Sequence, residues 1–153
     1  MLKLTQKKSF KYNYYSCIDA KLTSPQPEQH YLCNKKAIAE NGRIIFYGAE
    51  DYAVHEFQPY ILSKLSKTSV DGVIFFTFSQ FCYLNKPNII LILKLLKKKL
   101  SIHFARENIS IYTKKDFDTL LPVLIAFHNS VFFRQKLAIE IINFSKKNNA
   151  YFY

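Results

Sequence analysis

The chain has 153 residues, of which 49% are hydrophobic, and it contains only 3 glycines and 5 prolines. This length and composition predict one globular domain with a substantial core, and they exclude a fibrous or largely disordered chain. The formal charge of +11 favours anionic partners such as phosphates, nucleic acid or acidic glycans. Because 19 of the 22 basic residues are lysine, base-specific DNA recognition, which relies on arginine, is disfavoured.

The three cysteines, Cys17, Cys33 and Cys82, are odd in number and scattered, which indicates neither a disulfide framework nor a zinc site. We therefore expect no metal, no other cofactor and a cytoplasmic location. The N-terminal residues lack the long apolar core of a secretory signal. The densest apolar run, residues 89–96, is interrupted by Lys94 and is far shorter than the roughly 20 residues that a membrane-spanning helix needs.

Strands and helices alternate along the chain, as hydrophobic periodicity and turn residues indicate. In order, the sequence predicts a basic N-terminal arm over 1–13, strand 14–18, helix 27–40, strand 43–47, helix 55–66, strand 73–78, helix 87–99, strand 100–104, a short fifth strand 109–112 and a helical extension over 114–153. Such alternation predicts a parallel sheet covered by helices. The core over 14–113 should therefore be a three-layer α/β domain whose mostly parallel sheet has four to five strands and helices on both faces.

Particular residues mark the ends of these elements. Gly48 is expected to end the second strand, where a close-packed backbone is easiest to accommodate. The run over 73–78 is continuous, β-branched and aromatic, which is typical of a strand buried on both faces. Pro87 is placed in the first turn of the third helix. The C-terminal extension is expected to be interrupted at Pro122, and its apolar positions should pack on the core or pair with a second subunit.

Polar side chains near the ends of the predicted strands indicate a ligand site, since the carboxyl ends of parallel strands converge on one crevice. The candidates are Glu50, Asp51, Thr77, His103 and Arg106. A carboxylate or His103 can handle protons or sugar hydroxyls, and Arg106 can clamp an anion through its planar guanidinium. The alternatives are a carboxylate that caps the following helix, a hydrogen-bonded core histidine, and a structural ion pair of Arg106 with its acidic neighbour.

A second group of candidates lies near the start of the first predicted helix. Ser24 and Gln29, with the neighbouring His30, lie where the free amides of a helix N-terminus favour anions. They predict a small phosphate-binding corner, while capping of the helix by Ser24 explains the same residues without a ligand. The chain has no glycine-rich phosphate loop to accompany them.

Four phrases of the chain, taken together, resemble one protein family. They are Pro27-Glu28-Gln29-His30, Ala49-Glu50-Asp51-Tyr52-Ala53, Asp71-Gly72-Val73-Ile74-Phe75-Phe76 and Ser101-Ile102-His103-Phe104-Ala105-Arg106-Glu107-Asn108. Through them, the segment from about Tyr15 to Asp118 resembles the sporadic carbohydrate-cluster protein family, small bacterial proteins encoded among O-antigen and capsule biosynthesis genes. That family is similar in its strand and helix rhythm to the catalytic domain of serine recombinases. The resemblance implies a resolvase-like, flavodoxin-like fold and a role in surface polysaccharide biosynthesis.

The resemblance and the candidate residues together predict a protein that binds or transforms a sugar phosphate or a nucleotide-activated sugar. Whether it is an enzyme, such as an isomerase, lyase or transferase, stays open. The predicted catalytic residues are Glu50, Asp51 and His103, and the predicted substrate-binding residues are Ser24, Gln29, Thr77 and Arg106.

The alternative is a non-catalytic, resolvase-like binding module. Its basic surface would contact nucleic acid or a glycosyltransferase partner in glycan assembly. DNA strand exchange is disfavoured, because neither Ser16 nor Ser24 is followed by an arginine-rich loop and no helix-turn-helix segment is evident after Asp118.

Overall fold

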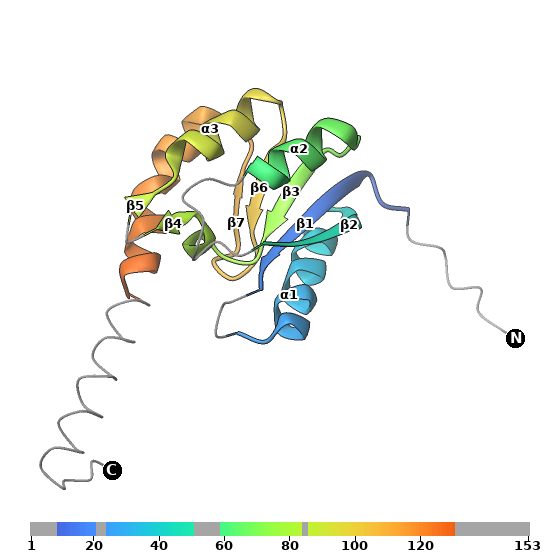
Figure 1. Ribbon diagram of the computed structural model, residues 1–153, viewed down its shortest axis with the longest axis horizontal. Coiled ribbons are helices and arrows are strands. Elements are labelled where there is room, and N and C mark those ends of the chain that lie inside the picture. The colour runs from blue at the N-terminus through green and yellow to red at the C-terminus, as the bar shows by residue number, and fades with distance from the viewer. Residues whose placement is uncertain (1–8, 21–23, 51–58, 84–85, 131–153) are drawn as a thin grey trace, which may run out of the picture.

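The computed structural model describes residues 9–20, 24–50, 59–83 and 86–130. In chain order its elements are β1 (Tyr12–Asp19), α1 (Gln26–Ala39), β2 (Gly42–Glu50), α2 (Pro59–Lys67), β3 (Gly72–Phe75), η1 (Phe78–Phe81), β4 (Cys82–Tyr83), β5 (Lys86–Pro87), α3 (Ile89–Lys97), β6 (Ser101–Phe104), β7 (Ile109–Ile111) and a C-terminal helix described over 114–130. The predicted α/β class is confirmed, since helices cover both faces of a mostly parallel sheet (Figure 1).

The main sheet has five strands in the order β2-β1-β3-β6-β7. When the five strands of this sheet are numbered 1 to 5 in chain order, their order across the sheet is 2-1-3-4-5, as in flavodoxin-like folds. β1 pairs in parallel with both β2 and β3, and β3 pairs in parallel with β6. β7 returns antiparallel to β6 at one edge. Four carboxyl ends, those of β2, β1, β3 and β6, therefore lie along the same edge of the sheet, which we call the carboxyl edge.

Each face of the sheet buries its own apolar cluster. On the face covered by α1, Ile18 and Ile74 of the sheet pack with Cys33 and Ala37 of the helix. The larger cluster on the other face joins the sheet to α2, α3, η1 and the C-terminal helix, with members that include Leu65, Phe75, Phe78, Phe81, Leu95, Phe104, Phe117 and Leu124. The described part of the C-terminal extension thus packs on the core through one side of its helix.

Two predicted strand ends were wrong. β2 runs through Gly48 to Glu50, because this glycine has an extended backbone and makes room for the Tyr15 ring on the neighbouring strand. β3 stops at Phe75, whereas the apolar run continues to residue 78. The strand ends early because Thr77 caps the short 3-10 helix η1 and turns the chain away from the sheet.

Two predictions about prolines were also wrong. Pro87 lies in β5, and α3 begins after Asn88, whose side-chain oxygen accepts a hydrogen bond from the Leu91 amide at 3.1 Å. The C-terminal helix continues through Pro122, at the cost of one backbone hydrogen bond, while Phe117 and Leu124 anchor it to the core on either side.

Several predicted features lie outside the described residues. They are the first eight residues of the N-terminal arm, Asp51, the start of the helix predicted from His55, and the extension beyond residue 130. Among the helices that the structure describes, none combines the length and the apolar character needed to cross a membrane.

Candidate functional site

The carboxyl edge holds five of the residues predicted to form a site. Glu50 ends β2, Thr77 follows β3, and Arg106 follows β6, where its amide donates to the Phe76 carbonyl at 2.8 Å. Gln29 and Ser24 lie beside the end of β1. The parallel topology therefore gathers side chains that are up to 82 residues apart in sequence along one edge of the sheet.

The side chain of Gln29 forms hydrogen bonds with backbone groups at this edge. Its side-chain oxygen accepts from the Asp19 amide at 3.1 Å, and its Nε2 donates to the carbonyls of Asp19 and Ser24, each at 2.9 Å. Both amide hydrogens are thus used within the fold, and the side chain is fully buried. The N-cap of α1 is Pro25, without a side-chain cap, so Ser24 takes part here through its carbonyl. These two residues shape the edge and leave no amide donor of Gln29 for a phosphate.

Thr77 is the centre of a tightly bonded turn. Its hydroxyl donates to Glu107 Oε1 at 2.5 Å and accepts from the Ser79 amide at 3.3 Å. The Gln80 side chain accepts from the Thr77 amide at 3.0 Å, which completes a capping box, and donates to a β1 carbonyl at 3.2 Å. η1 is therefore fixed to two other segments, the end of β1 and the loop after β6.

Glu107 was not among the predicted site residues, yet it is the acidic group closest to this turn. Besides Thr77, it accepts from the Phe78 amide at 3.3 Å. Burial raises the pKa of Glu107, against the opposing effects of its hydrogen bonds and of the Arg106 charge. A carboxyl group in this setting holds its proton to a higher pH than an exposed one.

A serine and histidine pair lies next to this turn, and sequence reasoning missed it. Ser79 Oγ is 2.9 Å from Nδ1 of His128, which comes from the C-terminal helix. Burial lowers the pKa of His128, and the nearby Arg106 charge lowers it further. One feature of the sequence indicates the position of His128. It continues the helical spacing of Phe117, Leu121 and Leu124, so a titratable ring interrupts the apolar stripe that packs on the core.

His103 does not join the carboxyl-edge group. It is fully buried on the face covered by α1, where Ser110 Oγ lies 2.9 Å from Nδ1 and Ser101 Oγ lies 2.9 Å from Nε2. The rings of Tyr14 and Tyr112 pack edge-on against it. Burial lowers the pKa of His103 to about 4. The arrangement is that of a hydrogen-bonded core histidine, the alternative that the sequence also allowed.

The hydrogen bonds around His103 extend to Glu40 at the end of α1. Ser110 and Tyr112 donate to the two Glu40 oxygens at 2.9 and 2.7 Å, and Lys36 forms an ion pair with it at 2.7 Å. Burial opposes ionisation of Glu40, but these hydrogen bonds outweigh it and lower its pKa to about 2. The network ties α1 to β6 and β7, and its partners are satisfied within the fold.

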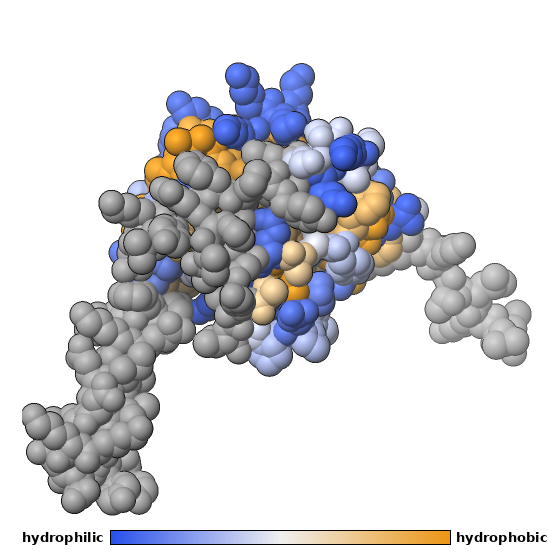
Figure 2. Space-filling model, in the orientation of Figure 1, coloured by the Kyte–Doolittle hydropathy of each residue, from blue (hydrophilic) through white to orange (hydrophobic). Residues whose placement is uncertain are grey.

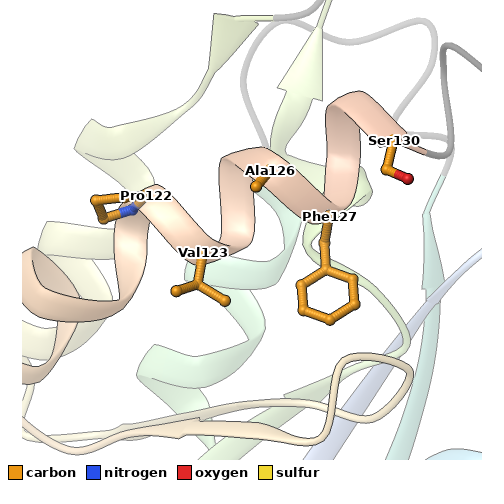
Figure 3. A pocket seen from close by; sticks show the side chains of 5 residues that line it. All are labelled: Pro122, Val123, Ala126, Phe127 and Ser130. Carbon is orange, nitrogen blue, oxygen red and sulfur yellow. The ribbon is translucent and has the colours of Figure 1, made fainter.

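A separate apolar hollow follows the outer side of the C-terminal helix (Figure 3). It is lined by Pro122, Val123, Ala126, Phe127 and Ser130, and Val123 and Phe127 point to the same side of the helix. It offers one hydroxyl and no titratable group among these residues, so it is not suited to proton or phosphate chemistry. Within the described ranges, no group of three or more histidine, cysteine or acidic side chains could hold a metal ion.

Comparison of the sequence with protein-family models and with curated proteins gives no match. The candidate site is therefore defined by the contacts at the carboxyl edge. It consists of Thr77, Ser79, Arg106, Glu107 and His128, and we refer to these five residues as the β3–β6 site.

Proposed function

We propose that the protein binds and transforms a sugar phosphate or a nucleotide-activated sugar at the β3–β6 site. The observation that carries the proposal is the meeting of a cation, a carboxyl group and a serine–histidine pair where parallel strands end. The positive charge of Arg106 contributes to lowering the pKa of both Glu107 and His128. An anionic group with neighbouring hydroxyls matches this combination of side chains.

Each side chain has a distinct role in this proposal. Arg106 is exposed and permanently charged, and its planar fork suits a phosphate group. Glu107, held by the Thr77 hydroxyl and the Phe78 amide, bonds a sugar hydroxyl or exchanges a proton with it. Glu50 is half-buried on the same edge but lies at the end of β2, with β1 between it and the β3–β6 site.

The resemblance of the Ala49–Ala53 and Ser101–Asn108 phrases to proteins of carbohydrate clusters supports the pathway part of the proposal, surface polysaccharide biosynthesis. Two of the residues in these phrases, Arg106 and Glu107, belong to the β3–β6 site. A sugar phosphate or nucleotide sugar is the form in which such pathways use their building blocks.

The test is calorimetric titration of the full chain with UDP-glucose and with glucose 1-phosphate. Arg106→Ala should weaken binding about 10- to 100-fold, because a hydrogen bond to a charged group contributes roughly 1.5–3 kcal/mol. Arg43→Ala is the matched control, since Arg43 lies at the opposite end of the sheet and donates to Asn13. Equal binding by the wild type and Arg106→Ala, or no binding by the wild type, would refute the proposal.

A specific observation favours a second candidate function, contact with nucleic acid. The ends of α2 and α3 and the start of the C-terminal helix lie at the amino end of the parallel strands, and Figure 2 shows hydrophilic side chains projecting where α2 and α3 end. We call this surface the lysine end. Its exposed members are Lys64, Lys67, Lys94, Lys97, Lys98, Lys99, Lys114 and Lys115. Lysines placed this way suit sequence-independent contacts with a phosphate backbone.

A further inference from the structure

Ser79 stands out among the serines of the described residues because it lies at the carboxyl edge against a histidine nitrogen. The two serines that the sequence offered as nucleophiles are placed differently: Ser16 is fully buried within β1, and Ser24 takes part in the structure through its carbonyl. Ser79 is only half-buried and belongs to the turn that directly follows β3. It is therefore accessible at the site where the proposed ligand would bind.

The surrounding bonds hold the Ser79 hydroxyl in a defined position. The Ser79 amide donates to Thr77, and Thr77 in turn donates to Glu107. His128 comes from a separate helix that Phe117 and Leu124 anchor in the core. Nucleophile and base thus come from two separate elements and meet at 2.9 Å, within the range at which a base takes a hydroxyl proton.

We propose that Ser79 is a nucleophile and that His128 is its general base, acting in phosphoryl transfer from a phosphorylated sugar. This inference rests on the proposed function for its substrate class. Two further observations agree with it. Burial lowers the pKa of His128, which favours the neutral imidazole that a base requires. In addition, Arg106 follows β6 at the same edge and is exposed, and a guanidinium can stabilise the charge on a transferring phosphoryl group.

The reaction has two stages, phosphorylation of Ser79 and hydrolysis of the phosphoserine. Ser79 Oγ attacks the phosphorus atom, a new O–P bond forms, and the bond from phosphorus to the sugar oxygen breaks. The hydroxyl proton passes to His128 Nδ1, which then donates it to the departing sugar oxygen. Water, deprotonated by the same imidazole, attacks the phosphoserine and releases inorganic phosphate, and the proton returns to Ser79 Oγ. Nδ1 accepts the first proton in the tautomer that carries its hydrogen on Nε2.

The first experiment uses diisopropyl fluorophosphate, a phosphoryl donor that reacts with activated serines without need of a sugar. Peptide mass spectrometry of the full chain should find the adduct on Ser79, and Ser79→Ala should lose it. His128→Gln should slow labelling about 100-fold or more, the usual contribution of a general base. Ser130→Ala, which removes an exposed hydroxyl on the same helix as His128, should be labelled at the wild-type rate. An unlabelled Ser79, or wild-type labelling in folded His128→Gln, would overturn the proposal.

A second measurement avoids any change at His128. In Ser79→Cys the imidazole should stabilise the thiolate and lower the thiol pKa below its ordinary value of about 8.5. Iodoacetamide should then alkylate this thiol at pH 7 at least about tenfold faster than the more exposed thiol of Ser130→Cys. An equal or slower rate would contradict an activated position.

These outcomes are separable from those of the binding test. If Ser79 is labelled and neither UDP-glucose nor glucose 1-phosphate binds, the nucleophile stands and the proposed substrate class fails. If the sugars bind and Ser79 stays unlabelled, the proposed function stands and the nucleophile fails.

Discussion

Two histidines of this protein, one buried and one half-buried, show how position decides the use of one residue type. His103 and His128 both have a depressed pKa, and burial is the main cause in each case. His103 lies between two serines inside the sheet, whereas His128 faces a half-exposed serine at the carboxyl edge. The first ring satisfies the hydrogen bonds of a core, and the second meets a hydroxyl that a ligand can reach.

Because His103 must stay neutral in the folded state, it should make the protein sensitive to acid. Its pKa of about 4 lies below the value of about 6.5 for an unfolded chain. The stability that this difference contributes is complete above pH 6.5 and is lost as the pH falls toward 4. The Glu40 carboxylate nearby favours the charged ring and Lys36 opposes it, but burial prevails.

The measurement is urea unfolding of the wild type and His103→Gln between pH 8 and pH 4. The wild type should lose about 2–3 kcal/mol of unfolding free energy in the window from 6.5 to 4, and His103→Gln should lack that part of the slope. Any loss of unfolding free energy that the substitution causes apart from titration is measured at pH 8, where the imidazole is neutral. Parallel pH curves for the two proteins would show that His103 does not titrate in this way.

Among the elements, the start of β3 is a tightly packed junction of the sheet. A Cβ at Gly72 would overlap the Ser101 side chain on β6 and lie 2.8 Å from the Ser101 carbonyl oxygen. It would also meet the Tyr14 ring at 3.1 Å on the other side. The absence of a side chain therefore allows β3 to pair with β1 and β6 in register at this point.

Gly72→Ala should lower the unfolding free energy by about 1–3 kcal/mol, since the backbone of β6 must shift to remove the overlap. Gly48→Ala is the matched control on β2, where the nearest atoms to the added methyl are the outer atoms of the Tyr15 ring and not backbone. Thermal unfolding followed by circular dichroism should therefore show the larger loss for Gly72→Ala. A larger loss for Gly48→Ala would contradict the packing argument.

Across the whole molecule, the two ends of the sheet differ in chemistry. The β3–β6 site lies at the carboxyl edge, while the lysine end lies at the opposite edge. Helices that connect parallel strands run back against them, so their C-termini gather at the amino end, where lysines also complement the helix dipoles. A small ligand and a polyanion would consequently bind at opposite ends of the molecule.

If the lysine end contacts nucleic acid, one charge reversal there should weaken binding to a duplex of about 20 base pairs and reduce the slope of log K against log salt by about 1. Lys98→Glu makes this change, and Lys35→Glu on the outer side of α1 is the matched control with the same change of net charge. Fluorescence anisotropy at several salt concentrations measures both variants. Equal weakening by the two would indicate that overall charge, and not this surface, attracts the duplex.

The sequence by itself determined the class of fold. Alternation of apolar strands with helical segments is a local pattern, and parallel pairing of the strands through right-handed connections follows from it. Because parallel strands end at the same edge of the sheet, this pattern also predicted that Glu50, Thr77 and Arg106 lie at one edge. The sequence did not determine where β3 ends and α3 begins. Thr77 caps η1 although the apolar run continues past it, and Asn88 caps α3 although Pro87 is also suited to a first helical turn.

Tertiary structure alone decided which polar groups meet. The pairing of Ser79 with His128 spans 49 residues, and the bond between Thr77 and Glu107 spans 30, so no local spacing contains either contact. His103 differs, since Ser101 lies two residues away on β6 itself, whereas Ser110 reaches the ring only because β7 pairs with β6. Burial and hydrogen bonding depend on neighbours brought together by packing, and these set the protonation state of each side chain and thereby its chemical use.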